Sequence, residues 1–405
     1  MNNAEPYIYA DNAATTPLSP CALNAMMPYL TRSYGNPGGI HRLAKQASAD
    51  LAALRKRTAA CLGCRDRELF FTSGGTESDN WALVGFCRLF AAQHPGAPVR
   101  IITSAIEHHA ILHTCQALRA HNVQVTYLPV DAQGFVSADD LAGALTSNDQ
   151  ANAAAGVNAP GTALVSIMLA NNEVGTIQNV SQLADLAHQY GAPFHTDAVQ
   201  AVGHIPVNVN ELGIDALSLS SHKFCGPHGV GALYVRNGFN LPPLINGGGQ
   251  EFSKRSGTQN LAGVAGTVAA LEESLEGLNE TMGRVSSLRD DLTHSVIAST
   301  ADVIATGPSD PKRRLPSIAS FICKNVDAEL LVGILDRMGV AAATGSACSA
   351  GSTEPSHVVQ ALGHTDPAWS RGTLRISLAN NVTAREIKLL KQRIPAAIDQ
   401  ARLLS

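Results

Sequence analysis

The sequence lacks long apolar runs: no stretch of 18 or more apolar residues occurs, and the N-terminus carries no cleavable signal. We therefore expect no membrane span and no secretion, and we predict a cytoplasmic protein. The chain also has little excess charge of either sign, since the net charge is only −4 over 405 residues. This balance offers no basic face for nucleic acid. What remains is a long chain, 45% hydrophobic, that can bury the cores of two or three domains.

Cysteine is present but lacks the patterns of a structural framework. A long chain without a secretory signal favours reduced thiols over disulfides. Cys61 and Cys64 form one CxxC pair beside an expected helix end, and no second pair follows at zinc-ribbon spacing. We therefore expect no resident metal. The eight cysteines are Cys21, Cys61, Cys64, Cys87, Cys115, Cys225, Cys323 and Cys348.

A glycine-rich turn at residues 70–83, FFTSGGTESDNWAL, lacks the GK[ST] ending of nucleoside-triphosphate sites. An apolar strand end leads into Ser73, Gly74, Gly75 and Thr76, and a helical pattern follows. Free backbone N–H groups at a helix N-terminus bind anions, and glycines let a phosphate approach closely. Gly75 and Thr76 are the predicted phosphate donors, with a plain turn as the alternative interpretation.

Lys223 lies between an apolar run and a Gly/Pro-rich turn in residues 218–236, SLSSHKFCGPHGVGALYVR. A lysine that forms a Schiff base must be partly unprotonated, so it belongs in a desolvated pocket, and its neighbours here are small, apolar or aromatic. Upstream, in FHTDAVQAVG (194–203), Asp197 follows a short apolar segment. Pyridoxal phosphate needs such a carboxylate at its pyridine nitrogen. The alternatives are a lysine that reaches solvent and an Asp that caps a helix beginning at Ala198.

Cys348 lies in AATGSACSAGSTEPSHVVQALG (342–363), among Gly, Ser, Ala and Thr, and a helical pattern begins near Pro355. This composition is typical of an accessible loop, whereas free cysteines are mostly buried and inert. The segment therefore offers a reactive thiol, with a structural cysteine as the alternative.

Short apolar runs alternate with helical stretches along the first two thirds of the chain, as in ALVSIMLA, APFHTDA and ALSLSS. This alternation predicts an α/β fold with a mostly parallel sheet covered by helices. Asn172, Asp197 and Ser220 fall at the carboxyl ends of such runs, where open α/β sheets place ligands. After about residue 266 the pattern changes to long helices, 268–278 and 284–299, and then to a smaller α+β segment. We predict a large domain at 15–265 and a small one made of 1–14 with 266–405.

Ten motifs, in order and at matching spacing, make the chain resemble the cysteine desulfurases of the NifS/IscS group, in the class V aminotransferase family. The resemblance covers nearly the whole chain and implies the fold-type I architecture with a large seven-stranded sheet, pyridoxal 5'-phosphate as cofactor, and a homodimer with sites at the interface. The motifs are DNAATTP (11–17), GNPGGIH (35–41), TSGGTESDN (72–80), EHHAIL (107–112), NNEVG (171–175), TDAVQ (196–200), SSHKFCGP (220–227), GGGQE (247–251), RSGT (255–258) and GSACSAGSTEPSH (345–357).

The resemblance also implies a role for each matching residue. Lys223 would form the Schiff base, Asp197 would hold the pyridine nitrogen, and Cys348 would be the nucleophile that takes sulfur from L-cysteine as a persulfide, leaving L-alanine. His108 would stack on the cofactor ring and shuttle protons, with a capping or core histidine as the alternative. The remaining ligands would be Asn172 and Gln200 at the phenolic oxygen side of the ring; Gly75, Thr76, Ser220, His222 and the neighbouring subunit's Thr258 at the phosphate; and Asn36 and Arg375 at the substrate carboxylate.

The resemblance implies that Cys348 passes its sulfur to an acceptor protein, for iron–sulfur cluster assembly or thiolation. Cys348 could also ligate a transient iron–sulfur cluster.

Two stretches depart from the family pattern. Residues 147–162 are an Ala/Asn/Gly-rich insertion, expected to be an exposed or disordered loop. The chain reads Ala379-Asn380-Asn381 where the family commonly has Gly-Arg, and it ends soon afterwards, at ARLLS. Housekeeping members have a longer tail that helps to dock the scaffold, so the pattern favours a specialised desulfurase.

Three other functions share most of these residues. A class V aminotransferase or a selenocysteine lyase would use Lys223, Asp197 and the phosphate site, but an aminotransferase has no use for Cys348 in a flexible loop. A non-catalytic adaptor on a retired enzyme fold would gain nothing from retaining the lysine, the aspartate, His108, Cys348 and Arg375. Selenocysteine and cysteine sulfinate are possible alternative substrates, because each carries a leaving group at the same carbon.

Overall fold

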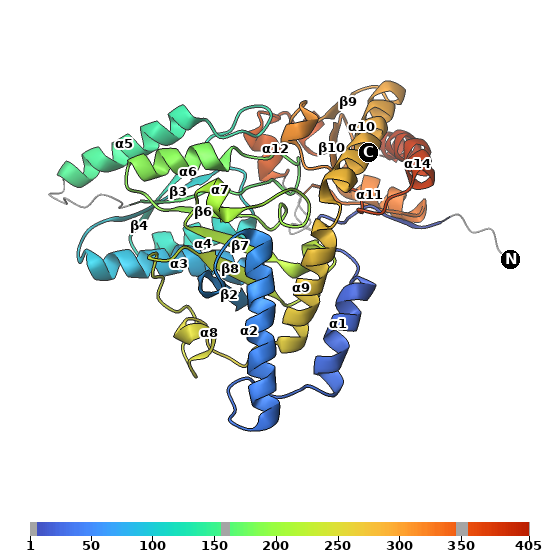
Figure 1. Cartoon of the computed structure of the whole chain (residues 1–405). Coiled ribbons are helices and arrows are strands. Elements are labelled where there is room, and N and C mark those ends of the chain that lie inside the picture. Colours follow the sequence, from blue (N-terminus) through green and yellow to red (C-terminus); the bar gives the residue numbers. More distant parts are fainter. Residues whose placement is uncertain (1–5, 155–162, 346–354, 405) are drawn as a thin grey trace.

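The central sheet has seven strands in the computed structural model, which describes residues 6–154, 163–345 and 355–404, without the side chains of 148–154. Strand β8 runs against both of its neighbours, and all other neighbouring strands are parallel (Figure 1). In sheet order the strands are β2 (Leu69–Thr72), β8 (Gly231–Val235), β7 (Ala216–Ser220), β6 (Phe194–Asp197), β5 (Ala163–Ser166), β3 (Val99–Ser104) and β4 (Val123–Leu128). Strands β5, β6 and β7 are buried along their whole length, as expected of a parallel sheet covered on both faces.

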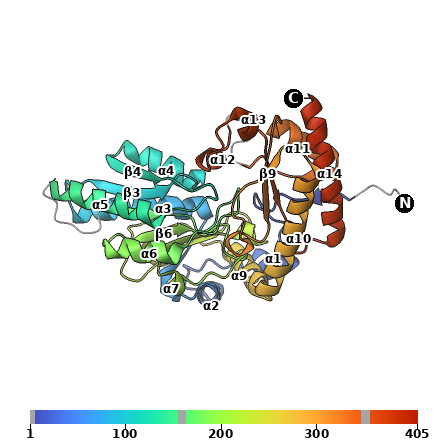
Figure 2. The same cartoon turned by 90° about the horizontal axis from the view of Figure 1, so that it is seen from above.

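Helices cover both faces of this sheet (Figures 1 and 2). On one face, α3 (Gly75–Gln93) and α4 (His109–Arg119) bury Trp81, Phe86 and Ile111 against strand residues such as Ile101. The other face packs in one core with residues of several helices. These helices are α1 (Pro20–Thr31), α2 (Arg42–Leu62), α5 (Ala138–Ala154), α6 (Val180–Gln189), α7 (Val209–Leu212) and α9 (Leu261–Leu275).

A second sheet and its helices lie beside the first (Figure 2). Strands β12 (Thr373–Ser377), β10 (Ile318–Cys323) and β9 (Val303–Ala305) are antiparallel. They share a separate core with α10 (Leu278–Ser299), α11 (Ala328–Arg337) and α14 (Ala384–Leu404). The N-terminal arm joins this unit through β1 (Ile8–Tyr9), which pairs with β11 (Val340–Ala341). The division into domains at 15–265 and 266–405 stays a prediction.

Short elements complete the chain. The helices are α8 (Gln250–Ser253), α12 (His357–Ala361) and α13 (Pro367–Ser370), and the 3-10 helices are η1 (Asp66–Glu68), η2 (Ser221–Lys223) and η3 (Pro311–Arg313). Helix α8 is irregular because Glu251 and Phe252 have left-handed backbone angles, with φ of 49° and 56°. The helix ending at Leu62 stops where expected, since Gly63 has the left-handed conformation of a helix C-cap.

Two sequence expectations about local structure need correction. The long helices are Leu261–Leu275 and Leu278–Ser299 rather than 268–278 and 284–299, because Gly277, with φ of 62°, separates them. The loop expected at 147–162 is wrong for its first part, since α5 continues to Ala154. Alanine and glutamine in this stretch favour a helix. The rest, 155–162, lies outside the described residues.

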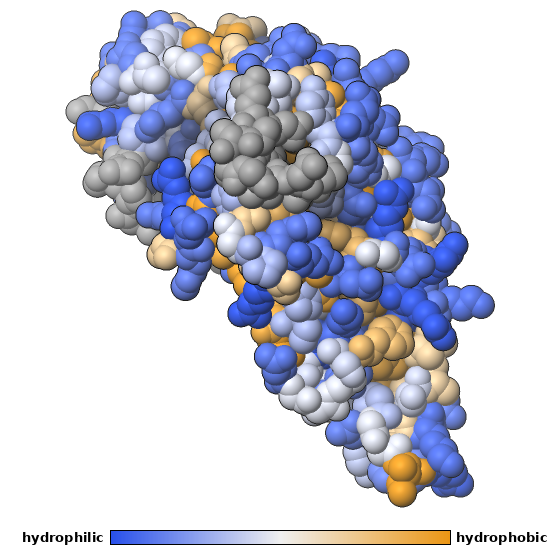
Figure 3. Space-filling model, turned by 90° about the vertical axis from the view of Figure 1, so that its left-hand side faces the viewer, coloured by the Kyte–Doolittle hydropathy of each residue, from blue (hydrophilic) through white to orange (hydrophobic). Residues whose placement is uncertain are grey.

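The face on the side of α5 and β4 is mostly hydrophilic with scattered hydrophobic patches (Figure 3). A hydrophobic patch marks its lower end, the end at which the α1–α2 connection lies in Figure 1. In that connection Tyr34 and Ile40 are 70% and 89% exposed. Within the described parts of the chain, no helix combines the length and apolar character that crossing a membrane requires.

Candidate active site

A cavity of about 280 Å³ lies at the carboxyl ends of the parallel strands, beside the smaller sheet. It gathers residues that are far apart in the sequence, because strand ends, helix N-termini and the N-terminal arm meet there. Ten of the residues singled out in the sequence line it: Gly75, Thr76, His108, Asn172, Asp197, Gln200, Ser220, His222, Lys223 and Arg375. Their placement agrees with the sequence analysis, while their individual roles stay predictions.

Lys223 ends the single turn η2 that follows β7, so its side chain enters the cavity and does not reach outward into solvent. The Nζ atom donates hydrogen bonds to Ala13 O at 2.7 Å and Ala14 O at 2.8 Å. Both acceptors belong to the N-terminal arm. The amine is therefore held in the cavity by neutral backbone carbonyl groups.

Asp197 ends β6, and the residues after it form turns rather than the helix considered for Ala198. Its Oδ1 accepts a hydrogen bond from Val199 N at 2.9 Å. Burial raises the pKa of Asp197 to about 6, opposed by that N–H group and by the charge of Lys223. A cationic ring nitrogen beside this carboxyl would favour its ionised form further.

The N-terminus of α3 closes one end of the cavity with Gly75 and Thr76. A Cβ atom on Gly75 would lie 2.5 Å from Val199 Cγ2, so any larger residue would require the Val199 side chain or the turn to shift. Glu77 accepts a hydrogen bond from Ser73 N at 2.9 Å and pairs with Arg255 at 2.8 Å, which braces the turn. The first N–H groups of a helix have no partner within it, so this end can bind an anion.

Two histidines in the cavity are electrically neutral near pH 7. Burial and the nearby Lys223 lower the pKa of His108 to about 4, and the same causes lower the pKa of His222 to about 4. His108 also caps α4, since its Nδ1 accepts a hydrogen bond from Ala110 N at 3.1 Å. The capping alternative and a place in the site are therefore both true of this residue. His222 Nδ1 lies 3.1 Å from Thr15 Oγ1 of the N-terminal arm.

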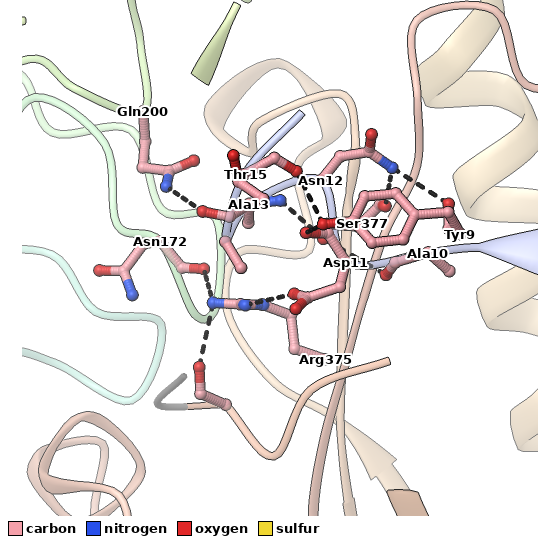
Figure 4. Close-up of polar contacts among 12 residues, drawn as sticks. Tyr9, Ala10, Asp11, Asn12, Ala13, Thr15, Asn172, Gln200, Arg375 and Ser377 are labelled. Atoms are coloured by element: carbon pink, nitrogen blue, oxygen red, sulfur yellow. Dashed lines mark hydrogen bonds and ion pairs between the residues drawn. The ribbon is translucent and has the colours of Figure 1, made fainter. Parts of the chain in front are cut away.

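Arg375 enters the cavity from β12 of the smaller sheet, and its Nη2 forms an ion pair with Asp11 Oδ1 at 2.7 Å (Figure 4). Gln200 Nε2 donates to Ala13 O at 2.8 Å in the same view. The smaller sheet and the arm thus both contribute residues to the lining of the cavity.

Two predicted site residues of the described part of the chain do not line this cavity, and a third is not described. Asn36 is exposed and its Oδ1 accepts a hydrogen bond from Gly38 N. Thr258, predicted to serve the neighbouring subunit, is exposed in its own chain. Cys348 lies outside the described residues.

Sequence reasoning missed several cavity residues, among them Asp79, Glu107 and His357. Asp79 is four residues after Gly75 on a helix, a spacing that puts both on one face and could have revealed it. It is fully buried, and burial together with the charge of Asp197 raises its pKa well above the usual range. Glu107 directly precedes His108 in the EHHAIL motif. His357 Nε2 lies 3.0 Å from Glu107 O, across a separation of 250 residues that no local pattern reveals.

Comparisons with known proteins agree on one family. The model of the class V aminotransferases matches residues 8–390. A cysteine desulfurase IscS of Dictyoglomus turgidum is 42% identical over 398 residues, which cover 98% of this chain and 96% of that one. A solved NifS-like protein superimposes with a TM-score of 0.86 at 33% identity, over 97% of this chain and 100% of the other. A structure of SspA in complex with cysteine matches with a TM-score of 0.76 at 31% identity, over 92% and 98%.

Proposed function

Because the chain belongs to the class V aminotransferase family, and within it to the cysteine desulfurases, we propose that it takes sulfur from L-cysteine with pyridoxal 5'-phosphate as cofactor. The observation that carries this proposal is the cavity in which the Lys223 amine, the Asp197 carboxyl and the N-terminus of α3 meet. An amine, a carboxylate and an anion site are the three partners that this cofactor requires of a protein.

The residues of the cavity fit that cofactor. Gly75 and Thr76, at the N-terminus of α3, line the cavity where backbone N–H groups without helical partners can bind a phosphate. Ser220 and His222 line the same cavity, and they are the further phosphate ligands that we propose. Lys223 supplies the amine for the carbonyl carbon, Asp197 the acceptor for the ring nitrogen, and neutral His108 a flat ring to stack on.

When bound, the cofactor supplies an electron sink for negative charge at the substrate's α carbon. The chain's own residues do the rest. Lys223 Nζ takes the α proton, and Asp197 stays ionised, because its carboxylate balances the charge at the ring nitrogen. Arg375 binds the substrate carboxylate, a task that suits a planar guanidinium.

Sulfur transfer would be the task of Cys348. The Cys348 thiolate attacks the substrate sulfur, the C–S bond breaks, and its electron pair remains with the carbon fragment. Protonation of that carbon gives L-alanine, while Cys348 keeps the sulfur as a persulfide. An acceptor protein, serving iron–sulfur cluster assembly or thiolation, then receives the terminal sulfur.

A homodimer belongs to the same proposal. Its support is the set of exposed apolar side chains on α1 and the connection to α2: Leu23, Met27, Leu30, Tyr34 and Ile40. Exposed apolar patches of this kind mark protein interfaces. Thr258 would complete the phosphate site of the partner across this interface, and a cytoplasmic location stays part of the proposal.

The test compares the purified wild type with Cys348→Ala. We expect the wild type to bind the cofactor, with its visible absorbance, and to release equimolar alanine and sulfide from L-cysteine plus a thiol. Cys348→Ala should keep the absorbance and lose both products, whereas Cys225→Ala, a matched change of another cysteine, should retain them. Full activity of Cys348→Ala would favour a lyase that eliminates sulfide directly, and a wild type without cofactor would refute the proposal.

A further inference from the structure

Arg375 is 1% exposed and is held on three sides by different parts of the chain. Its Nη2 donates to Asp11 Oδ1 at 2.7 Å, and its Nη1 donates to Asn172 O and to Gly345 O, both at 3.0 Å (Figure 4). Asp11 belongs to the N-terminal arm, Asn172 to the segment after β5, and Gly345 to the segment after β11. The guanidinium therefore has a fixed plane before any substrate arrives.

These contacts leave the Nε–H group of the guanidinium without a hydrogen-bond partner among the described residues. The group has five N–H bonds, of which Nη1 uses two and Nη2 one. Arg375 Nε is buried and has no hydrogen-bond partner among the described residues. Nε and Nη2 share the edge that makes two parallel hydrogen bonds to a carboxylate. An unpartnered buried donor is costly, so this Nε points to a ligand that is still to bind.

Asp11 is the charged group that sets this geometry. Its side chain is 20% exposed, and among the described residues the carboxylate forms its hydrogen bond with Arg375. The other two acceptors are neutral backbone carbonyls, which hold the plane of the guanidinium. The buried carboxyl of Glu173 also interacts electrostatically with Arg375, but burial raises its pKa, and Asp11 is the carboxylate that is hydrogen-bonded to the guanidinium. The Asp11 carboxylate balances that buried charge while the substrate is absent.

We propose that Asp11 is a positioning residue for substrate recognition: it fixes Arg375 so that the Nε edge meets the carboxylate of an α-amino acid. This rests on the proposed function, in which Arg375 binds that carboxylate. The consequence is specificity, since a thiol-bearing amine without a carboxylate gains nothing from the arrangement. Asp11 does not touch the substrate in this proposal, and it acts only through Arg375.

The experiment measures dissociation constants in the Cys348→Ala background, in which sulfur transfer is blocked. The absorbance change of the bound cofactor is titrated with L-cysteine and with cysteamine, which has the same amine and thiol but no carboxylate. We expect Asp11→Ala to weaken L-cysteine binding at least tenfold and to change cysteamine binding by less than twofold. Asp11→Asn keeps a hydrogen-bond acceptor without the charge, so its loss should be intermediate. With Arg375→Lys already present, Asp11→Ala should have little further effect.

Asp336→Ala is the matched control, because Asp336 also ties down the N-terminal arm, through Tyr7 Oη at 2.6 Å, but away from the cavity. It should leave both constants unchanged. Equal weakening of both ligands by Asp11→Ala and Asp11→Asn would show a merely structural role and overturn the inference. Tighter binding of L-cysteine would overturn it too, since Asp11 would then compete with the substrate. If the parent responds to neither ligand, the proposed function fails instead.

Discussion

Glu107 offers a sharp test of the electrostatics of the cavity, through the substitution Glu107→Gln. Its carboxyl is 1% exposed and accepts hydrogen bonds from Ser104 Oγ at 2.5 Å and Met168 N at 3.0 Å. No cation pairs with it among the described residues. Burial raises the pKa of Glu107 from 4.5 to about 8, although these hydrogen bonds oppose the shift. The native protein therefore holds this side chain as a neutral acid near pH 7.

The shift makes stability depend on pH in one direction. The unfolded chain loses the proton first as the pH rises, because its carboxyl has the lower pKa. Each pH unit between about 4.5 and 8 then lowers the free energy of unfolding by about 1.4 kcal/mol. The contribution of Glu107 is fully present below pH 4.5 and is lost by about pH 8, where the native carboxyl also ionises. The total is on the order of 5 kcal/mol.

Urea unfolding of the cofactor-free wild type and Glu107→Gln, at intervals from pH 5 to pH 9, measures this contribution. The advantage of the variant should grow by about 1.4 kcal/mol per pH unit up to pH 8 and then level off, because glutamine does not titrate. The lost or altered hydrogen bonds add a constant offset that does not vary with pH. Glu280→Gln, which changes an exposed glutamate on α10, is the control for removing one carboxylate. Parallel curves for Glu107→Gln and wild type would refute a neutral Glu107.

Two further substitutions test the phosphate turn and the irregular helix α8. Gly75→Ala should weaken cofactor binding at least tenfold, measured by absorbance titration, because its Cβ would lie 2.5 Å from Val199 Cγ2; Gly283→Ala, with open space around it on α10, should not. Glu251→Ala should lower the free energy of unfolding in urea by about 3–5 kcal/mol. In the wild type, buried Arg55 donates two 2.7 Å hydrogen bonds to the Glu251 carboxylate, and the substitution leaves that buried charge without its counter-ion. Arg55→Met with Glu251→Leu should recover most of that loss, and a double variant as unstable as the single one would contradict the argument.

The predicted site residues that line the cavity share a local signal. Lys223 and Asp197 each follow an apolar strand, and the carboxyl ends of parallel strands meet at one edge of the sheet. The pattern of apolar and polar residues along the sequence is therefore enough to predict that the two side chains lie close together. Gly75 and Thr76 carry the signal of a strand, a turn and a helix. The mostly parallel character of the sheet follows from the same alternation, whereas its seven strands were implied by the resemblance to the family. Helix boundaries were less accurate, because a single left-handed Gly277 decides where one helix ends and the next begins.

Other features of the cavity depend on the tertiary structure more than on local signals. Arg375 was predicted, but its ion pair with Asp11 was not, because the two residues are 364 apart and only the packing of the arm against the smaller sheet brings them together. Glu107 and Asp79 look like ordinary surface carboxylates of helix termini until the sheet buries them. Burial is a property of the tertiary structure, so the neutral state of these groups could not be derived from the residues around them.

The N-terminal arm decides how the cavity is completed, although it contributes no group with obvious chemistry except Asp11. Ala13 O accepts hydrogen bonds from both Lys223 and Gln200, and Asp11 holds Arg375, which belongs to the other sheet (Figure 4). One short segment therefore fixes the distance between the amine proposed to take the α proton and the guanidinium proposed to bind the substrate carboxylate. Both must engage the same small amino acid, so their separation has to be held closely. The arm contacts both sheets, so its backbone carbonyls hold this separation more rigidly than two mobile side chains could. This explains why residues without reactive groups belong to the site.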